Sequence, residues 1–403
     1  MFKSVKEILK AHEALSKEVY LDLENSNPVF PEVVEEMLPY FYKKAYGNPT
    51  ITHKQGWEAY ETILEASKII SKFIGATSPE EINFMGGDVE ANNTALLGAA
   101  LASKKPSKKI VISSAEPLTI DLIAQLLIEK GFHVVKIPVD SEGFILQDKL
   151  AENVDKETVL VSISAVNPEI GTIQPLKEIS EVVKDKNPEI LLHTDASDAY
   201  ARINFNVKEL NVDMATLNSH KIQGPRGIAA LYVREEIKIE RVIEGPLGTQ
   251  QLWPGIENTP LIVGFKKASE ICFKNFEQDV QHMRNLRDKL IKGIFESVND
   301  VLLNGPQGDK RAPDNVNISF LHCEGESLTV ELSLRGVYVS SGSACTRRML
   351  QPSHILTAIG RKYEEAHGSI LMKISRRHSE EDIGYVLEQL PQAVKRLRTL
   401  SPV

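Results

Sequence analysis

The stretch TLNSHKIQGPRGIAALYVR, residues 216–234, places a lysine between two runs of different character. Its last part, GIAALYV (227–233), is short, apolar and typical of a buried strand. Lys221 precedes it in a loop that follows His220 and ends in a Gly-Pro-Arg-Gly turn (224–227). A lysine at the mouth of a sheet can form a Schiff base when its surroundings lower the pKa of the ammonium group. Most lysines in turns are only surface residues, but here the neighbours favour a chemical role.

Outward from this loop, short apolar runs alternate with helical patterns from about residue 80 to residue 235. Two helices are expected, at TIDLIAQLLIEKGF (119–132) and PLKEISEVVKDK (175–186). The expected strands are KIVISSA (109–115), HVVKIPVD (133–140), TVLVSISAV (158–166), ILLHTD (190–195), VDMATLN (212–218) and GIAALYV (227–233). This alternation predicts an α/β fold with a mostly parallel sheet covered on both faces. Ligands bind at the C-terminal ends of such strands, where Asp195 and residues 218–221 fall.

The alternation of short apolar runs with helical patterns does not continue after Pro260. The run LIVGFKKASEICFKNFEQDVQHMRNLRDKLIKGIFESV (261–298) is amphipathic throughout and predicts one extended helix. NVNISF (315–320) and GVYVSS (336–341) follow as expected strands. We therefore expect a large cofactor-binding domain over residues 16–262 and a smaller α+β domain over 263–403, with an N-terminal helix (1–15) packed on the smaller one. A chain of 403 residues is long enough for two domains.

Composition and charge exclude several classes of function. The net charge is −8 and no basic run of five residues occurs, so no nucleic-acid partner is expected. No apolar run approaches the roughly 18 residues that cross a bilayer, and the N-terminus lacks the features of a signal peptide. The cysteines are Cys272, Cys323 and Cys345, without a CxxC pair. This odd, sparse set predicts neither a disulfide framework nor a metal site, and is consistent with a cytoplasmic protein.

Two segments besides the lysine loop contain candidate ligand-binding residues. HTDASDAY (193–200) ends a strand with Asp195, whose carboxylate can face a bound heterocycle or simply cap a helix. INFMGGDVEANNTALLGAA (82–100) combines a strand, a Gly-Gly turn and a helix start, and backbone N–H groups at such a turn bind phosphate. Gly87, Asp88 and Val89 are the candidate residues of that turn.

A third segment, GVYVSSGSACTRR (336–348), places Cys345 in a run of small polar residues. Arg347 and Arg348 follow closely and favour the thiolate form of the cysteine. A reactive thiol is one interpretation, and an incidental exposed cysteine is the other.

In combination these segments resemble one family. The chain is similar to the cysteine desulfurases, which are class V aminotransferases of the fold-type I pyridoxal-phosphate enzymes. The resemblance covers nearly the whole length, in order. It rests on VYLDLENSNPVFPEV, YGNPTITHKQGWEAYETI, MGGDVEANN, AVNPEIGTIQP, HTDASDAY, NSHKIQGPRGIAALYVR, PGIENTPLIVGF, GESLTVELSLRGVYVSSGSACT and QPSHILTAIG.

The resemblance implies a role for each matching residue. Lys221 would bind pyridoxal 5′-phosphate covalently, and Asp195 would pair with the ring nitrogen and keep it protonated. Asn167 would lie near the ring hydroxyl or the substrate carboxylate, and His220 would reach the phosphate. Cys345 would take sulfur from substrate cysteine as a persulfide. The resemblance also implies a homodimer with the cofactor near the subunit interface, and a protein that accepts the sulfur.

The chain departs from the family in the phosphate cup. Val89 replaces a hydroxyl residue of the turn, and Asn218 stands where the family usually has a serine. Ile256 replaces the threonine that a partner subunit lends to the phosphate. The cup therefore loses hydrogen-bond donors.

Further departures concern the ring and the substrate. Asp198 stands where a glutamine supports the ring hydroxyl, and no histidine occurs near Glu116–Pro117, where one is expected to stack on the ring. Leu371 aligns with the arginine that clamps the substrate carboxylate. Loss of such a bidentate partner costs on the order of 2–5 kcal/mol. Arg376 or Arg377 is a candidate substitute.

Three functions are compatible with this pattern. The first is a cysteine desulfurase with a remodelled pocket, which supplies sulfur for iron–sulfur cluster or thio-cofactor synthesis. The second is a related pyridoxal-phosphate lyase or aminotransferase acting on another amino acid, which the missing histidine and arginine favour. The third is a catalytically weakened sulfur-transfer partner protein, which the altered phosphate cup favours. The SSGSACT segment argues against the second, because other chemistries need no such thiol, and Lys221 argues against the third.

Overall fold

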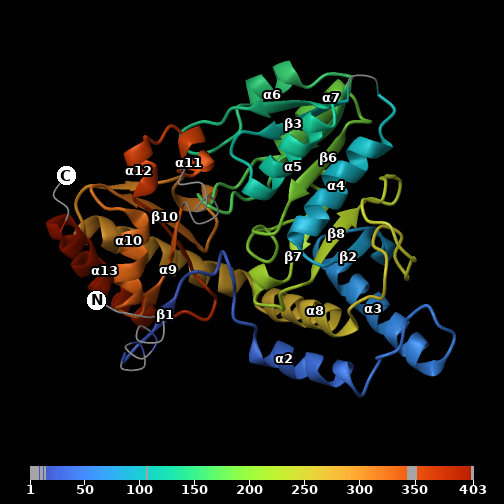
Figure 1. Cartoon of the computed structure of the whole chain (residues 1–403), viewed down its shortest axis with the longest axis horizontal. Helices are drawn as coiled ribbons and strands as arrows, with labels where there is room; N and C mark the ends of the chain where they lie inside the picture. Colours follow the sequence, from blue (N-terminus) through green and yellow to red (C-terminus); the bar gives the residue numbers. More distant parts are fainter. Residues whose placement is uncertain (1–8, 10–11, 13–14, 106–107, 343–351, 401–403) are drawn as a thin grey trace.

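A computed structural model describes residues 9, 12, 15–105, 108–342 and 352–400 (Figure 1). Its centre is a seven-stranded sheet in the order β2-β8-β7-β6-β5-β3-β4. The five strands from β7 to β4 are parallel, whereas β8 and β2 run antiparallel to their neighbours. The bounds are β2 (Ile82–Met85), β3 (Lys109–Ser113), β4 (His133–Ile137), β5 (Thr158–Ser162), β6 (Leu191–Asp195), β7 (Met214–Asn218) and β8 (Ala229–Val233). The mostly parallel sheet expected from the sequence is confirmed.

Helices cover both faces of this sheet, which explains why its strands are apolar without alternation. The helices are α2 (Pro31–Met37), α3 (Lys54–Phe73), α4 (Asp88–Ala102), α5 (Leu118–Glu129), α6 (Gln147–Asn153), α7 (Leu176–Lys186) and α8 (Thr259–Lys274). Residues of α3, α7 and α8 form one buried cluster with Val111 and Leu217 of the sheet. Residues of α4 and α5 form another with Ile110 and Met214. Successive strand residues thus enter opposite cores.

The C-terminal part of the chain builds a second, smaller sheet in the order β12-β13-β10-β9, which is antiparallel. Its strands are β9 (Val301–Leu303), β10 (Asn315–Phe320), β12 (Ser340–Ser341) and β13 (Ser369–Lys373). The helices beside it are α9 (Phe276–Ser297), α10 (Gly325–Ser333), α11 (His354–Ala358), α12 (Tyr363–His367) and α13 (Glu380–Leu400). Near the N-terminus, β1 (Val19–Tyr20) pairs in parallel with β11 (Val337–Tyr338), which attaches this early segment to the C-terminal part of the structure (Figure 1).

Short 3-10 turns complete the described structure. They are η1 (Leu38–Phe41), η2 (Pro79–Glu81), η3 (His220–Ile222) and η4 (Gly308–Lys310). Within the part of the chain that the structure describes, no helix is long and apolar enough to cross a membrane.

The single helix expected over residues 261–298 is wrong, because α8 ends at Lys274 and α9 begins at Phe276. Asn275 between them has a non-helical backbone, with φ −124° and ψ 33°. The two helices pack in different hydrophobic cores. Phe265 of α8 packs in the cluster of the large sheet, whereas Leu290 of α9 packs in the cluster of the small sheet. A continuous amphipathic pattern cannot reveal this change of partner.

The helices α8 and α9 pack in different buried clusters. The division expected between residues 262 and 263 stays a prediction, as does the N-terminal helix, most of which lies outside the described residues. His12, which is described, contacts the backbone oxygen of Ser333 through Nε2 at 2.8 Å. This contact brings the N-terminal segment to α10 of the smaller part.

Candidate active site

The C-terminal ends of β6 and β7 open into a cavity of about 290 Å³ between the two sheets. Parallel strands place their C-terminal loops at one edge, which is why Asp195 and the loop after Asn218 meet there. The cavity is close to the lower end of the volumes that hold small ligands, ~300–1,000 Å³. Its walls include Glu24, Asp88, Glu169, Asp195, Ser197, Asp198, His220, Lys221, Ser340, Ser341, Gly342, Ser353, His354, Ile355 and Leu371.

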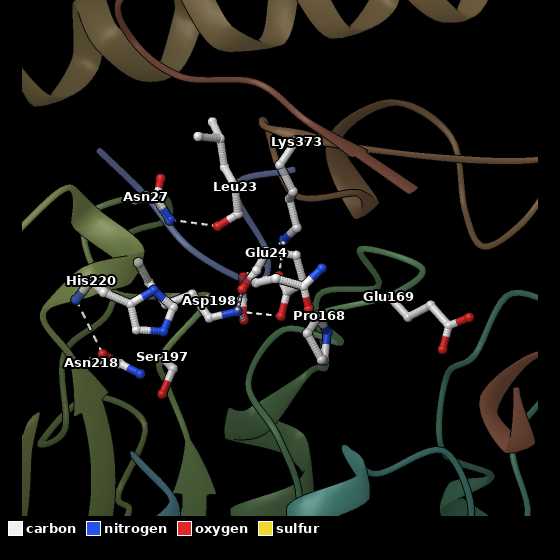
Figure 2. A network of polar contacts seen from close by, with 12 residues as sticks. Leu23, Glu24, Asn27, Pro168, Glu169, Ser197, Asp198, Asn218, His220 and Lys373 are labelled. Carbon is white, nitrogen blue, oxygen red and sulfur yellow. Dashed lines mark hydrogen bonds and ion pairs between the residues drawn. The ribbon is translucent and has the colours of Figure 1, made fainter. Parts of the chain in front are cut away.

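Lys221 lies buried at this site, with 6% of its surface exposed, and is held by two carboxylates. These are Glu24 and Asp198, both labelled in Figure 2. Its Nζ donates to Glu24 Oε1 and, at 3.1 Å, to the backbone oxygen of Glu24. It also lies 3.3 Å from Asp198 Oδ2. Burial lowers the pKa of the Lys221 amine, but attraction to Asp198 and Glu24 outweighs burial and raises this pKa above its usual 10.5. Lys221 is therefore an ammonium ion in this arrangement.

A second buried lysine shares the same carboxylates. Lys373 on β13 is 1% exposed and donates to Asp198 Oδ1 at 2.8 Å. Its Nζ lies 3.3 Å from Glu24 Oε2 and 3.9 Å from Asp314 Oδ2. Burial raises the pKa of Asp198, but the charges of Lys221 and Lys373 prevail and hold that pKa below its ordinary value. Asp198 is thus a fixed negative charge between two lysines.

Arg202 extends this ion cluster beneath the lysine loop. Its Nη2 donates to the backbone oxygen of Lys221 at 2.6 Å, and its Nε pairs with Asp314. Both ionic partners are almost fully buried. The cluster therefore fixes the backbone of the lysine loop as well as the side chain of Lys221.

Asp195 is oriented by two donors from different elements. Asn92 of α4 donates through Nδ2 to Oδ2 at 2.7 Å, and the backbone N–H of Ser197 donates to Oδ1 at 2.9 Å. Burial and then the Asp88 carboxylate raise the pKa of Asp195 to about 6. A positively charged ring nitrogen beside this carboxylate would lower that pKa and stabilise the ionised form.

Next to Lys221, His220 and Asn218 present unused polar atoms. Asn218 Oδ1 accepts from the backbone N–H of His220 at 3.1 Å, which positions one residue against the other (Figure 2). Asn218 Nδ2, His220 Nδ1 and Ser197 Oγ are buried and have no hydrogen-bond partner among the described residues. Burial and then the Lys221 charge lower the pKa of His220 to about 4, so its ring is neutral. Unpaired buried polar groups are costly, and a bound polar group would satisfy them.

The residues predicted for the phosphate turn do not all face the cavity. Asp88, the first residue of α4, lines the cavity, whereas Val89 is 56% exposed and lies with Gly87 on a separate shallow hollow. The backbone N–H of Gly86 already donates to the Glu90 carboxylate. The turn therefore offers a carboxylate to the cavity, where a phosphate would prefer donors.

Asn167 is buried outside the set of cavity-lining residues, and its side chain organises a loop. Its Oδ1 accepts from the backbone N–H groups of Glu169 and Ile170, each at 3.0 Å. Its Nδ2 donates to the backbone oxygen of Ala115 at 2.7 Å. These contacts position Glu169, which does line the cavity. The direct ligand contact expected of Asn167 stays a prediction.

Glu116 stands in the region where a ring-stacking histidine was expected. It is 3% exposed, and Ser164 donates to it from the backbone nitrogen at 3.1 Å and from Oγ at 2.6 Å. Burial outweighs these bonds and raises the pKa of Glu116 to about 8. The backbone oxygen of Glu116 contacts His354 Nε2 at 2.8 Å, so a histidine from α11 reaches this wall of the cavity.

Arg376 and Arg377 do not replace the missing arginine. Leu371 lines the cavity, as its alignment with the carboxylate clamp implies. Arg376 is paired with Asp279 at 2.9 Å and Arg377 with Glu32 at 2.8 Å. Among the described lining residues the only basic side chains are Lys221, His220 and His354. The proposed substitution by Arg376 or Arg377 is therefore wrong.

Sequence reasoning missed Glu24 and Lys373, which are central to the ion cluster, and Glu169. Glu169 Oε2 accepts from Ser353 Oγ at 2.6 Å, while its Oε1 is buried without a hydrogen-bond partner in the described structure. Burial raises the pKa of Glu169 to about 8. A lysine inside the apolar strand SILMK (369–373) was the one available signal, because a charge is rarely buried unless it is paired.

Cys345 lies outside the described residues. The described chain ends at Gly342 and resumes at Pro352. Residues on both sides of that interval, Gly342 and Ser353, line the cavity.

Comparison with known proteins identifies the family of the chain. Residues 19–385 match the family Aminotransferase class-V. The chain is 40% identical over 390 residues to the cysteine desulfurase IscS of Clostridium botulinum, covering 96% of this chain and 97% of the relative. It is 40% identical over 384 residues to cysteine desulfurase IscS 1 of Archaeoglobus fulgidus, covering 95% of this chain and 99% of the relative. A solved NifS-like protein superimposes with a TM-score of 0.87 at 32% identity, over 94% of this chain and 100% of that one.

The chain belongs to the class V aminotransferase family, and its fold is that of the fold-type I pyridoxal-phosphate enzymes. Its cofactor is pyridoxal 5′-phosphate. The cavity fits this group in three respects: a buried lysine, a carboxylate at the end of β6, and unsatisfied polar atoms on the lining residues Ser197 and His220. The carboxylate of Asp88 is the feature that fits the phosphate least.

The raised pKa of Glu116 predicts how stability depends on pH. Between its usual pKa of 4.5 and about 8, the folded protein holds a proton that the unfolded chain has lost. Stability must therefore fall as pH rises through this window, by about 1.4 kcal/mol per pH unit from this group. Glu116→Gln should flatten the decline in urea-unfolding free energy between pH 5 and pH 8. Glu35→Gln on the exposed face of α2 is the control, and equal slopes for Glu116→Gln and wild type would contradict the assignment.

The acidic phosphate turn predicts that the cofactor binds more tightly when Asp88 is neutralised. Removing one negative charge near a phosphate is worth about 1 kcal/mol, so Asp88→Asn should lower the dissociation constant of pyridoxal phosphate about fivefold. Val89→Thr should have a smaller effect, because Val89 does not line the cavity. Absorbance titration of cofactor-free protein measures both, and weaker binding by Asp88→Asn would refute this view of the turn.

Proposed function

We propose that the protein is a pyridoxal-phosphate-dependent cysteine desulfurase that moves sulfur from L-cysteine to Cys345 as a persulfide and releases L-alanine. The observation that carries the proposal is the placement of Lys221 in a cavity whose walls include residues on both sides of the Cys345 segment. The names of the relatives support it. A solved structure described as SspA in complex with cysteine also resembles this chain, with a TM-score of 0.77 at 31% identity.

Different residues of the cavity would bind the cofactor and transfer protons. Lys221 Nζ would hold the cofactor covalently, and Ser197, Asn218 and His220 would donate to its phosphate. Asp195 would keep a proton on the ring nitrogen. Pyridoxal phosphate, when bound, supplies an electron sink that weakens bonds at the substrate α-carbon. Lys221 Nζ would also be the group that takes the α-proton of the substrate.

Substrate binding must proceed without the arginine clamp. The wall of the cavity around Leu371 offers the neutral hydroxyl donors of Ser340 and Ser341. We assign the substrate carboxylate to these groups. Neutral hydrogen bonds of this kind are worth about 1 kcal/mol each, less than a bidentate arginine, so the Michaelis constant for cysteine should be high.

Four finer aspects of the function are also proposals. The first is a homodimer, which the exposed apolar side chains of Val89 and Ile256, 56% and 63% exposed, support. The second is a protein that accepts the sulfur, for iron–sulfur cluster or thio-cofactor synthesis. The third is a cytoplasmic location, since a reducing compartment keeps a nucleophilic thiol free of disulfides. The fourth is the absence of a nucleic-acid or membrane partner, for which the net charge of −8 is the support.

The proposal predicts two coupled products. Wild-type protein incubated with L-cysteine should form alanine, and mass spectrometry should find one added sulfur on the Cys345 peptide. Cys345→Ser should stop both signals while the visible absorbance of the bound cofactor remains. Lys221→Ala should abolish alanine formation and the borohydride-fixed cofactor label, because the attacking amine is gone.

Cys323→Ser is the matched control for the cysteine, because Cys323 is a half-buried thiol that does not line the cavity. It should leave alanine and persulfide formation unchanged. If cofactor-loaded wild type forms neither product, the desulfurase proposal fails. If Cys345→Ser forms alanine at the wild-type rate, the reaction is a lyase reaction that does not use this thiol.

A further inference from the structure

Glu24 touches the reactive nitrogen of Lys221 from a short, well-held turn after β1. Its Oε1 accepts from Lys221 Nζ, and the backbone oxygen of the same residue accepts from Nζ at 3.1 Å. Asn27 Nδ2 closes the turn by donating to the backbone oxygen of Leu23. Arg226 anchors the adjoining segment through a bond to Ser26 Oγ at 2.5 Å. The carboxylate is therefore positioned by the fold (Figure 2).

An ammonium group has no lone pair, so Lys221 must lose a proton before its nitrogen can bond to a carbonyl carbon. Two carboxylates touch Nζ, but they differ in their other partners. Asp198 Oδ1 receives a hydrogen bond from Lys373 at 2.8 Å. Glu24 Oε2 lies 3.3 Å from Lys373 yet accepts no hydrogen bond within the described structure. Both carboxylates face both lysines, but only Asp198 accepts a hydrogen bond from Lys373, so Oε2 of Glu24 keeps a lone pair that can carry a proton.

We propose that Glu24 is a further catalytic residue, which accepts the proton of the Lys221 ammonium group when this amine bonds to a carbonyl carbon and returns the proton when water leaves. The inference rests on the function proposed above only in taking Lys221 as the amine that binds the cofactor. It assigns a proton acceptor that neither the lysine loop nor the family comparison supplies.

The step balances as follows. Glu24 takes one proton from the ammonium group, and the nitrogen lone pair forms the C–N bond to an aldehyde carbon. The second nitrogen proton passes to the former carbonyl oxygen, which becomes a hydroxyl group. Glu24 then protonates this hydroxyl, water leaves, and a protonated C=N bond remains on Lys221. The carboxylate is regenerated, and no oxidant or reductant is needed.

The groups that face Glu24 decide which carboxyl takes the proton. Burial and repulsion by Asp198 raise the pKa of Glu24, and attraction to Lys221 and Lys373 only partly offsets this. The pKa of Asp198 is instead held down by the two lysines. The charged and titratable groups around Glu24 are Lys221, Asp198, Lys373, Arg202 and Glu169. Glu24 is therefore the easier of the two carboxylates to protonate.

The rate at which the full-length, cofactor-free protein captures pyridoxal phosphate tests the proposal. A positioned general base contributes about 10²–10⁴-fold to such a step, so Glu24→Gln should slow capture at pH 7 by about tenfold or more. A purely structural Glu24 predicts the opposite sign. Removing its charge would then lower the pKa of Lys221, increase the fraction of free amine and speed capture. A Glu24→Gln rate equal to or above that of wild type overturns the proposal.

Two further variants keep the test decisive. Glu35→Gln removes an exposed carboxyl on α2 that does not line the cavity, and it should capture the cofactor at the wild-type rate. Glu24→Asp retains a carboxylate and should recover most of the lost rate, and it also serves if Glu24→Gln does not fold. Failure of Glu24→Asp to exceed Glu24→Gln, with both folded, would likewise refute a proton-transfer role.

The readout is independent of what the loaded protein does with cysteine. Growth of visible absorbance on mixing with pyridoxal phosphate, followed by borohydride fixation to the Lys221 peptide, reports only formation of the C=N bond. A protein that captures the cofactor through Glu24 but forms no alanine would retain this inference and lose the desulfurase assignment. If the protein forms alanine while Glu24→Gln captures the cofactor at the full rate, the desulfurase assignment is retained and this inference is lost.

Discussion

Two buried lysines that share two carboxylates hold this active site together. Lys221 and Lys373 meet at Glu24 and Asp198, and the four side chains come from four distant segments of the chain. Removing one member of such a cluster leaves a buried charge unpaired, which typically costs ~3–5 kcal/mol. The cluster therefore binds the N-terminal turn, the loop after β6, the lysine loop and β13 of the small sheet into one structure. The geometry of the cavity depends on these segments remaining together.

The same cluster determines the chemistry that the cavity can perform. Its lysine amine, Lys221, lies beside a carboxylate, Glu24, that we propose as its proton acceptor. Nearby are the carboxylate at the end of β6 and unpaired polar atoms on Ser197, Asn218 and His220. The cavity is also acidic, because the carboxylate of Asp88 lines it beside the carboxylates of the cluster. Leu371 adds no positive charge to offset them. Under the proposed function, substrate and phosphate would be held by neutral hydrogen bonds more than by ionic ones, unlike in a site built around an arginine clamp.

Sequence patterns predicted the features that local physics determines. Buried parallel strands are apolar on both faces, so all six expected strands of the large sheet lie where the apolar runs are, and Lys221 stands in the loop that its neighbours indicated. The division of the long amphipathic run at Asn275 could not be predicted, because α8 and α9 each have one apolar face and differ only in which core receives it. The pairing of Glu24 with Lys373 joins residues far apart in the chain, and no local pattern encodes it.

Departures from the family pattern were visible in the sequence, but their meaning was not. Asp198 was evident as a replacement for a glutamine, yet only the structure shows that a second lysine compensates for its charge. Arg376 and Arg377 were reasonable candidates for a clamp by their positions, and their ion pairs elsewhere remove them. Substitutions inside an ion cluster are interpretable only together, because each charge is balanced by residues that are distant in sequence.

The protonation of Lys221 is the most direct measure of this account. In cofactor-free protein with ¹⁵N-labelled lysine, the Nζ resonance of Lys221 can be assigned by its absence in Lys221→Arg and followed through a pH titration. The account predicts that the pKa of Lys221 lies above its ordinary 10.5, so that the resonance stays in the ammonium range through pH 10. A Lys221 that titrates below its ordinary pKa would show that burial prevails over Glu24 and Asp198, and would contradict the ion cluster on which the site depends.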